Sequence, residues 1–119
     1  MSDLITVRVF DIVGGPLGVS ADDGQRVFDR ISPLLREGKK LSLSFEQIET
    51  LISSFLNAAI GQLYGKFPEE KIRELLSVRD MDAEDLTMLK RVVENAKVYF
   101  KDPKRFDKAW KEEVGNDEE

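Results

Sequence analysis

The segment KKLSLSFEQIETLISSFLNAAIG, residues 39–61, decides the fold class because its hydrophobic pattern changes period partway along. Leucine and phenylalanine alternate with serine over residues 41–45, which is the period of a β-strand. From residue 56 onward, apolar side chains recur at helical spacing over much of the circumference, which is typical of a deeply packed helix. The segment therefore predicts a strand that leads into a buried helix, with Ser53 and Ser54 at the junction.

Strand and helix patterns also alternate along the rest of the chain. They predict strands over residues 4–12 and 41–45, a short strand or a turn over residues 17–19, and helices over residues 21–38, 54–67, 83–100 and 103–114. Residues 69–78 are compatible with a helical turn up to Leu75 and with a strand from Leu75 to Val78. This alternation favours an α/β fold: a single domain with a mixed β-sheet of about four strands covered by helices on at least one face. We expect the domain over residues 1–97, a C-terminal helical extension over 98–114 and a disordered acidic tail over 115–119.

Individual residues are expected to start or interrupt these helices. Ser20, Ser53 and Asp82 fit N-cap positions, where a side-chain oxygen accepts a hydrogen bond from a first-turn amide, for about 1 kcal/mol each. Pro33 lies inside a predicted helix, where it removes a hydrogen bond at a cost of about 3 kcal/mol. We therefore expect a kink or a short final turn there, with the helix ending at Gly38.

The composition excludes several kinds of active site. The chain of 119 residues contains no cysteine and no histidine. Thiol catalysis, Ser-His-Asp hydrolysis and ordinary zinc sites are therefore excluded, and we expect neither a metal nor a cofactor. The formal charge of -5 is unlike the basic stripe of a nucleic-acid-binding protein. No apolar stretch approaches the ~20 residues of a membrane span and no signal peptide is recognised, so we expect a soluble, cytoplasmic protein.

Three neighbouring segments together resemble the STAS domain, the fold of bacterial anti-sigma-factor antagonists. They are the helix GQRVFDRISPLLREG, the strand KKLSLSFEQIETL and the junction ISSFLNAAIGQLYG. More specifically, the chain resembles a STAS-like family of unknown function that has Ser-Ser-Phe at this junction, followed by a helix of small residues. The resemblance covers about residues 5–97, and the last predicted helix lies outside it.

The resemblance implies a phosphorylation site at the junction. In the antagonists, a partner kinase phosphorylates the second serine of an Asp-Ser-Ser-Gly motif at the start of this helix, and phosphorylation releases the partner. Carried over, that position is Ser54, which is the phospho-acceptor candidate. Ile52 and Phe55 stand where the antagonists have Asp and Gly, and the phenylalanine favours the STAS-like family over a true antagonist.

The implied function is that of a non-enzymatic regulatory domain that binds another protein. The candidate partner-binding residues are Ser53, Ser54, Phe55 and Asn57. We expect the loop GGPLG, residues 14–18, to belong to the same surface. The resemblance names the kind of partner as a histidine-kinase-like ATPase or an anti-sigma-type kinase.

Other classes of function stay open at this point. The chain is alternatively a structural self-association module: Phe106 and Trp110 lie four residues apart on one helix face, which either folds back onto its own domain or forms a homodimer contact. Basic and aromatic residues interleave over residues 97–111, as in single-strand binders. Acidic residues dilute that charge, so we do not expect nucleic-acid binding.

Paired acids are the remaining candidates for catalysis. Asp22 and Asp23 form one pair, and Asp80 and Asp82 form another. Both pairs lie at expected helix starts, where the helix dipole favours acidic side chains. We therefore interpret them as capping residues and expect no enzyme activity.

Overall fold

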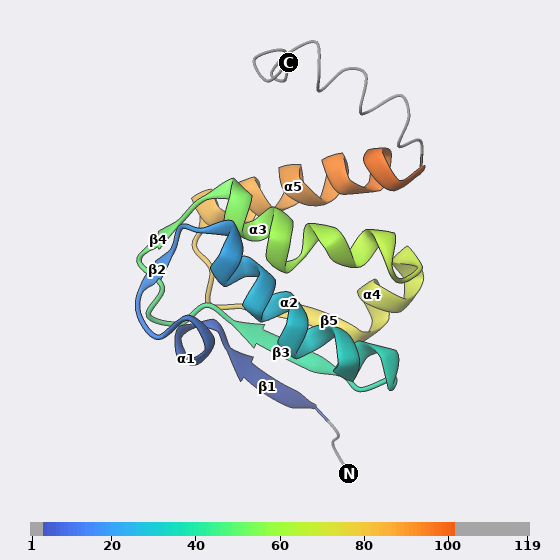
Figure 1. Ribbon diagram of the computed structural model, residues 1–119, viewed down its shortest axis with the longest axis horizontal. Helices are drawn as coiled ribbons and strands as arrows, with labels where there is room; N and C mark the ends of the chain where they lie inside the picture. Colours follow the sequence, from blue (N-terminus) through green and yellow to red (C-terminus); the bar gives the residue numbers. More distant parts are fainter. Residues whose placement is uncertain (1–3, 102–119) are drawn as a thin grey trace.

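The structure is a computed structural model that describes residues 4–101. The predicted last helix over residues 103–114 and the predicted acidic tail over residues 115–119 lie outside the described residues. In chain order the elements are β1 (Ile5–Arg8), α1 (Val9–Val13), β2 (Leu17–Gly18), α2 (Ala21–Arg36), β3 (Leu41–Ser44), β4 (Thr50–Leu51), α3 (Ser53–Ala59), the 3-10 helix η1 (Gly61–Gly65), α4 (Glu69–Leu75), β5 (Leu76–Arg79) and α5 (Ala83–Lys101) (Figure 1).

The strands form two small parallel sheets, and this confirms the predicted α/β class. The larger sheet has three strands in the order β1-β3-β5, and β2 pairs with β4 in a separate sheet of two strands. All three pairings are parallel. The predicted sheet was a single mixed one, whereas the strands are parallel because helices connect β1 to β3 and β3 to β5.

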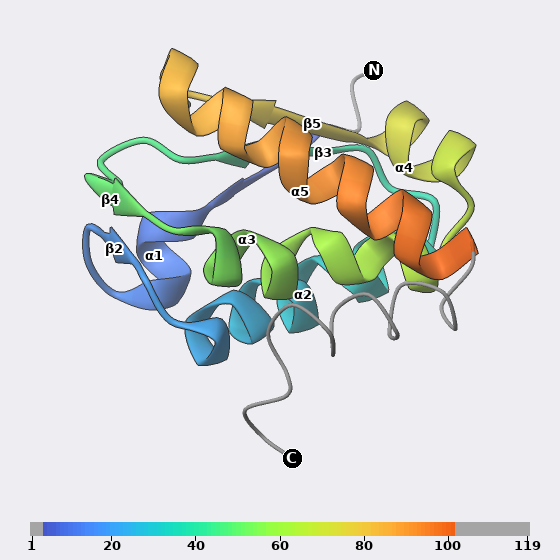
Figure 2. The same cartoon turned by 90° about the horizontal axis from the view of Figure 1, so that it is seen from above.

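The larger sheet has one apolar face and one polar face. Leu43 of β3 lies in register with Val7 and Val78, and Leu41 lies in register with Ile5 and Leu76. Successive residues of a strand point to opposite faces, so these six side chains share one face and pack into the core. Figure 2 shows β3 and β5 along one side of the domain and α2 and α3 along the other. The helices therefore cover the apolar face.

Helices α2 and α3 pack unusually closely. Gly24 of α2 is buried, and a Cβ atom placed there would lie 2.4 Å from the carbonyl oxygen of Phe55 and 2.9 Å from the Cβ of Ala58. Phe55 itself is completely buried. The absence of a side chain at Gly24 therefore sets how closely α3, and with it the junction that precedes it, approaches α2.

The strand predicted over residues 4–12 is only partly correct. Strand β1 ends at Arg8, and residues 9–13 form the short helix α1. That helix ends at Gly14, which has φ of 83°, and the Gly14 amide donates to the carbonyl of Phe10 at 2.8 Å. A left-handed glycine is a common helix end, so Gly14 ends a helix where the sequence predicts the end of a strand.

The prediction for Pro33 and for most helix starts is confirmed. Helix α2 passes through Pro33 and ends at Arg36, so the proline begins a short final turn that closes at Gly38. Ser20 caps α2, because its Oγ accepts a hydrogen bond from the amide of Asp23 at 3.0 Å. Asp82 caps α5, because its Oδ1 accepts from the amide of Asp85 at 2.9 Å.

The helix predicted over residues 54–67 is divided in two. Helix α3 ends at Ala59, and the chain continues as the tighter helix η1. Helix α5 packs against this segment, since a Cβ atom at Gly61 would lie 3.5 Å from Val92. A tighter 3-10 turn commonly extends the end of an α-helix, and the small glycines at both ends of η1 make room for α5.

Candidate functional site

The junction between β4 and α3 positions the two serines. Ile52 has extended backbone angles, φ -124° and ψ 163°, and its amide donates to the carbonyl of Gly18 at 3.0 Å. Ile52 is therefore the N-cap residue, and Ser53 is already the first residue of the helix. The prediction that Ser53 caps this helix is wrong by one position, because the backbone bond to Gly18 keeps Ile52 extended. No side chain caps α3.

The structure divides the predicted partner-binding residues into exposed and buried ones. Ser53 and Ser54 are exposed at the start of α3, and Asn57 is exposed about one turn further along it. Phe55 is 0% exposed and lies in the core, where its ring approaches Gly18. A partner cannot touch a side chain buried in this way, so the structure corrects the assignment of Phe55 to the binding surface.

The loop GGPLG lies against the junction, as expected. The carbonyl of Pro16 accepts hydrogen bonds from the amides of Glu49 at 2.8 Å and Thr50 at 3.3 Å. Parallel pairing of β2 with β4 then places Leu17 beside Thr50 and Gly18 beside Leu51. Two segments more than 30 residues apart in the sequence thereby form one surface.

Large apolar side chains are exposed on this surface. Leu17 is 51% exposed, and Val19 and Ile52 are each 39% exposed. Leu17 and Val19 flank the buried Gly18, and Ile52 follows the buried Leu51, so all three project from the outer side of the β2–β4 pair. We call Leu17, Val19, Ile52, Ser53, Ser54 and Asn57 the junction face.

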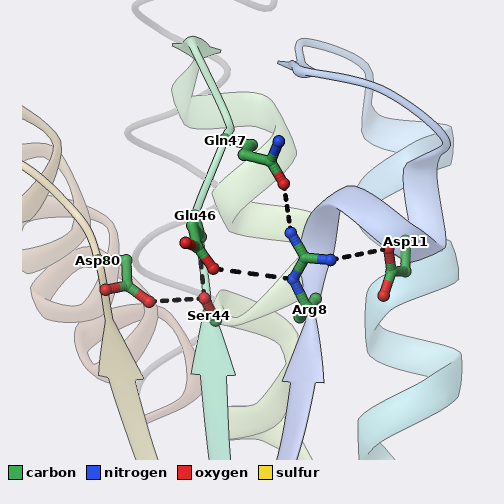
Figure 3. A network of polar contacts seen from close by, with 6 residues as sticks. All are labelled: Arg8, Asp11, Ser44, Glu46, Gln47 and Asp80. Atoms are coloured by element: carbon green, nitrogen blue, oxygen red, sulfur yellow. Dashed lines mark hydrogen bonds and ion pairs between the residues drawn. The ribbon is translucent and has the colours of Figure 1, made fainter.

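A polar network lies where the three strands of the larger sheet end (Figure 3). The guanidinium of Arg8 contacts Asp11 at 3.3 Å and Glu46 at 3.9 Å, and it donates to Gln47. The Oγ of Ser44 donates to the Oδ2 of Asp80 at 2.6 Å. It also accepts a hydrogen bond from the amide of Glu46 at 3.2 Å.

This network ties together the loops that follow the strands. Gln47 and Asp80 have φ of 68° and 65°, a conformation that non-glycine residues adopt uncommonly. Their side chains contact Arg8 and Ser44, so the network holds these two turns in place. Sequence reasoning placed Asp80 at a helix start and did not single out Arg8 or Ser44. The strand pattern contains no signal for Arg8, because it continues to residue 12, whereas the observed strands end at Arg8 and Ser44.

The network does not form a metal centre. Within residues 4–101, no group of three or more histidine, cysteine, aspartate or glutamate side chains could hold a metal ion. The acids of the network are already engaged with Arg8 or Ser44. The network therefore has a structural role, which is to hold the ends of the strands. The candidate functional site is the junction face.

A cavity of about 250 Å³ lies beneath α5. Its apolar lining comes from η1, α4, β5 and α5 and includes Ile72, Leu76, Val78, Leu89 and Val93. Hydrogen bonds from Lys97 at 2.8 Å and Arg73 at 2.7 Å hold the pKa of the partly exposed Glu69 carboxyl at its rim below the ordinary value. Burial raises the pKa of Tyr64 beside them.

Among residues 4–101, no helix is both long enough and apolar enough to cross a lipid bilayer.

The fold and site define a class of protein: a small α/β domain with parallel strands, helices on the apolar face of its main sheet and an exposed strand-to-helix serine pair. Residues 23–86 match the model of a family described as STAS-like domain of unknown function (DUF4325). This match spans more than half of the 119-residue chain, so the chain belongs to that family. No curated protein and no solved structure matches it significantly.

Family membership confirms the resemblance inferred from the Ser-Ser-Phe junction. The matched residues run from the start of α2 to the start of α5 and include the whole strand-to-helix junction. The description of the family names a fold and no catalytic activity.

Proposed function

We propose that this protein is a non-enzymatic regulatory domain whose junction face binds another protein, and that phosphorylation of Ser54 switches this binding. The observation that carries the proposal is the position of the exposed Ser54 beside exposed large apolar side chains. The resemblance to anti-sigma-factor antagonists supports the same surface and names the partner as a histidine-kinase-like ATPase that phosphorylates the domain.

The apolar side chains of the junction face support protein binding. Leu17, Val19 and Ile52 account for three of the seven large apolar residues that are clearly exposed within residues 4–101. They gather on one short strand pair and are bordered by hydroxyl and amide groups. An apolar centre with a polar rim is the usual anatomy of an interface between proteins.

The surroundings of Ser54 support a switch by phosphate. A phosphate adds roughly -1.5 to -2 charges at pH 7. The first turn of α3 contains no acidic side chain, whereas α2, α4 and α5 each carry two acids there. A phosphate on Ser54 would therefore meet no carboxylate within that turn, and its charge would fall next to the apolar side chain of Ile52. An interface that buries this apolar centre would lose affinity when the charge appears.

Three of the four acids considered for catalysis have structural partners, which supports a non-enzymatic role. Asp23 pairs with Arg26 at 3.1 Å, Asp82 caps α5, and Asp80 accepts a hydrogen bond from Ser44. Together with the absence of histidine and cysteine, this leaves the described residues without a recognisable general base and nucleophile pair.

The partner surface is tested by site-specific photocrosslinking in the native cell. A photoreactive amino acid at position 17, where Leu17 is 51% exposed, is expected to crosslink a histidine-kinase-like ATPase. Position 98 is a matched control, because Val98 is 50% exposed and lies near the end of α5, at the opposite end of the domain from β2 and β4 (Figure 1). Equal crosslinking from both positions, or none from position 17, would contradict the proposed binding face.

A further inference from the structure

The cavity beneath α5 combines an apolar interior with a polar opening. Its apolar lining residues lie in or next to η1, α4, β5 and α5: Ile60, Ile72, Leu76, Val78, Leu89 and Val93. The other lining residues are polar, and their side chains are partly or mostly exposed: Tyr64, Glu69, Arg73 and Lys97. A molecule that fills this cavity therefore needs an apolar body and one polar end that reaches the opening.

The size of the cavity suits a small molecule. Its volume is about 250 Å³. An engineered protein cavity of about 150 Å³ with an aliphatic and aromatic lining binds benzene, and pockets for drug-sized ligands begin at about 300 Å³. The volume therefore accommodates a ring or a chain of about six to eight carbon atoms together with a polar group.

The charged residues at the opening favour a negatively charged polar end. Arg73 and Lys97 contact the same oxygen of Glu69, Oε2, at 2.7 and 2.8 Å. Among the lining residues, two positive charges therefore converge on one negative charge. Glu94 also contacts Lys97, at 3.6 Å, but its side chain is 71% exposed and does not line the cavity. Within residues 4–101, only one guanidinium nitrogen of Arg73 has a partner, so the others can donate to an anion.

We propose that the cavity beneath α5 binds a small monocarboxylate with an apolar chain or ring. The apolar body occupies the interior, and the carboxylate accepts hydrogen bonds from Arg73 and Lys97 at the opening. The hydroxyl of Tyr64 is a third donor at the same place. No residue of the junction face lines this cavity, so the site is separate from that face and does not depend on the proposed function.

Isothermal titration calorimetry of the full-length chain with octanoate tests the site. We expect saturable binding of one octanoate per chain at concentrations below those at which it forms micelles. Octanamide and octylammonium have the same apolar chain and differ in the charge of the polar end. Octanamide should bind about threefold to fivefold more weakly, because an exposed ion pair contributes up to about a factor of five. Octylammonium should bind more weakly still.

Val93→Phe tests the apolar part of the site, because the larger ring takes the space of the ligand chain. It should weaken octanoate binding by about tenfold or more, since each buried methylene group contributes about a factor of four. Val98→Phe is the matched control. Val98 is 50% exposed on the same helix and does not line the cavity, so this variant should bind octanoate like wild type.

Arg73→Gln keeps the test valid if Val93→Phe fails to fold. The Arg73 side chain is 69% exposed, so its replacement should leave the fold intact, weaken octanoate binding about threefold to fivefold and leave octanamide binding unchanged. Arg91→Gln is the control, because Arg91 is exposed on α5 about 200° around the helix from Val93. Three results would overturn the proposal: no saturable binding of octanoate, equal affinity for octanoate and octylammonium, or octanoate affinity that Arg73→Gln or a folded Val93→Phe protein leaves unchanged.

Discussion

Gly24→Ala is expected to lower the free energy of unfolding by about 3 kcal/mol, because the new methyl group has no space. It would lie 2.4 Å from the carbonyl oxygen of Phe55 and 3.2 Å from the amide nitrogen of Ala59. Both are backbone atoms, so no side chain can rotate away and α3 must shift from α2. The higher helix propensity of alanine, about 1 kcal/mol, offsets only part of this cost.

The effect is measured by urea denaturation, with Gly15→Ala as the matched control. A Cβ atom at Gly15 meets no atom within 4 Å, and its backbone is not left-handed, so we expect a change within about 0.5 kcal/mol. Equal stability of the two variants would show that α2 and α3 are not in the close contact described. Because this contact fixes the start of α3, Gly24→Ala is also expected to displace Ser53 and Ser54.

Phe55→Ala is expected to destabilise the domain by about 3–5 kcal/mol, as is usual when a buried phenylalanine is truncated. The side chain is 0% exposed, and its ring packs against Gly18 of β2. Differential scanning calorimetry or urea denaturation measures the loss. Phe55 therefore affects the junction face indirectly, because its burial anchors the helix that carries Ser53 and Ser54.

Ile52→Ala is the natural comparison for Phe55→Ala, because the two residues flank the serines. Ile52 is 39% exposed, so its truncation should cost less than about 1 kcal/mol and should instead weaken partner binding. If Phe55→Ala were as stable as wild type, Phe55 would belong to the binding surface after all, and the division of the junction into exposed and buried residues would be wrong.

Local periodicity predicted most of the elements correctly. The alternation over residues 41–45 gave the central strand β3, and the spacing over residues 83–100 gave α5. It failed at residues 9–13, where the pattern of a strand continues although the chain forms helix α1. Val9 is buried in α1, and the strand pattern also predicts it to be buried, so its apolar character does not distinguish the two conformations; the left-handed Gly14 is compatible with the helix end.

The site depended more on long-range contacts, and so it was predicted less completely. Ser53, Ser54 and Asn57 are exposed near the expected helix start. The apolar part of the junction face was not foreseen, because it requires the parallel pairing of Leu17 with Thr50 across 33 residues. The burial of Phe55 likewise depends on the position of α2, where Gly24 allows the close approach.

The central claim is that the junction face binds a protein and that phosphorylation of Ser54 releases it. The most direct test is the affinity of the partner captured at position 17 for wild type, Ser54→Ala and Ser54→Asp, measured by calorimetry. The account predicts that Ser54→Ala binds like wild type, and that Ser54→Asp binds at least about tenfold more weakly, or ~1.4 kcal/mol. Equal affinity of Ser54→Asp and Ser54→Ala would contradict the switch.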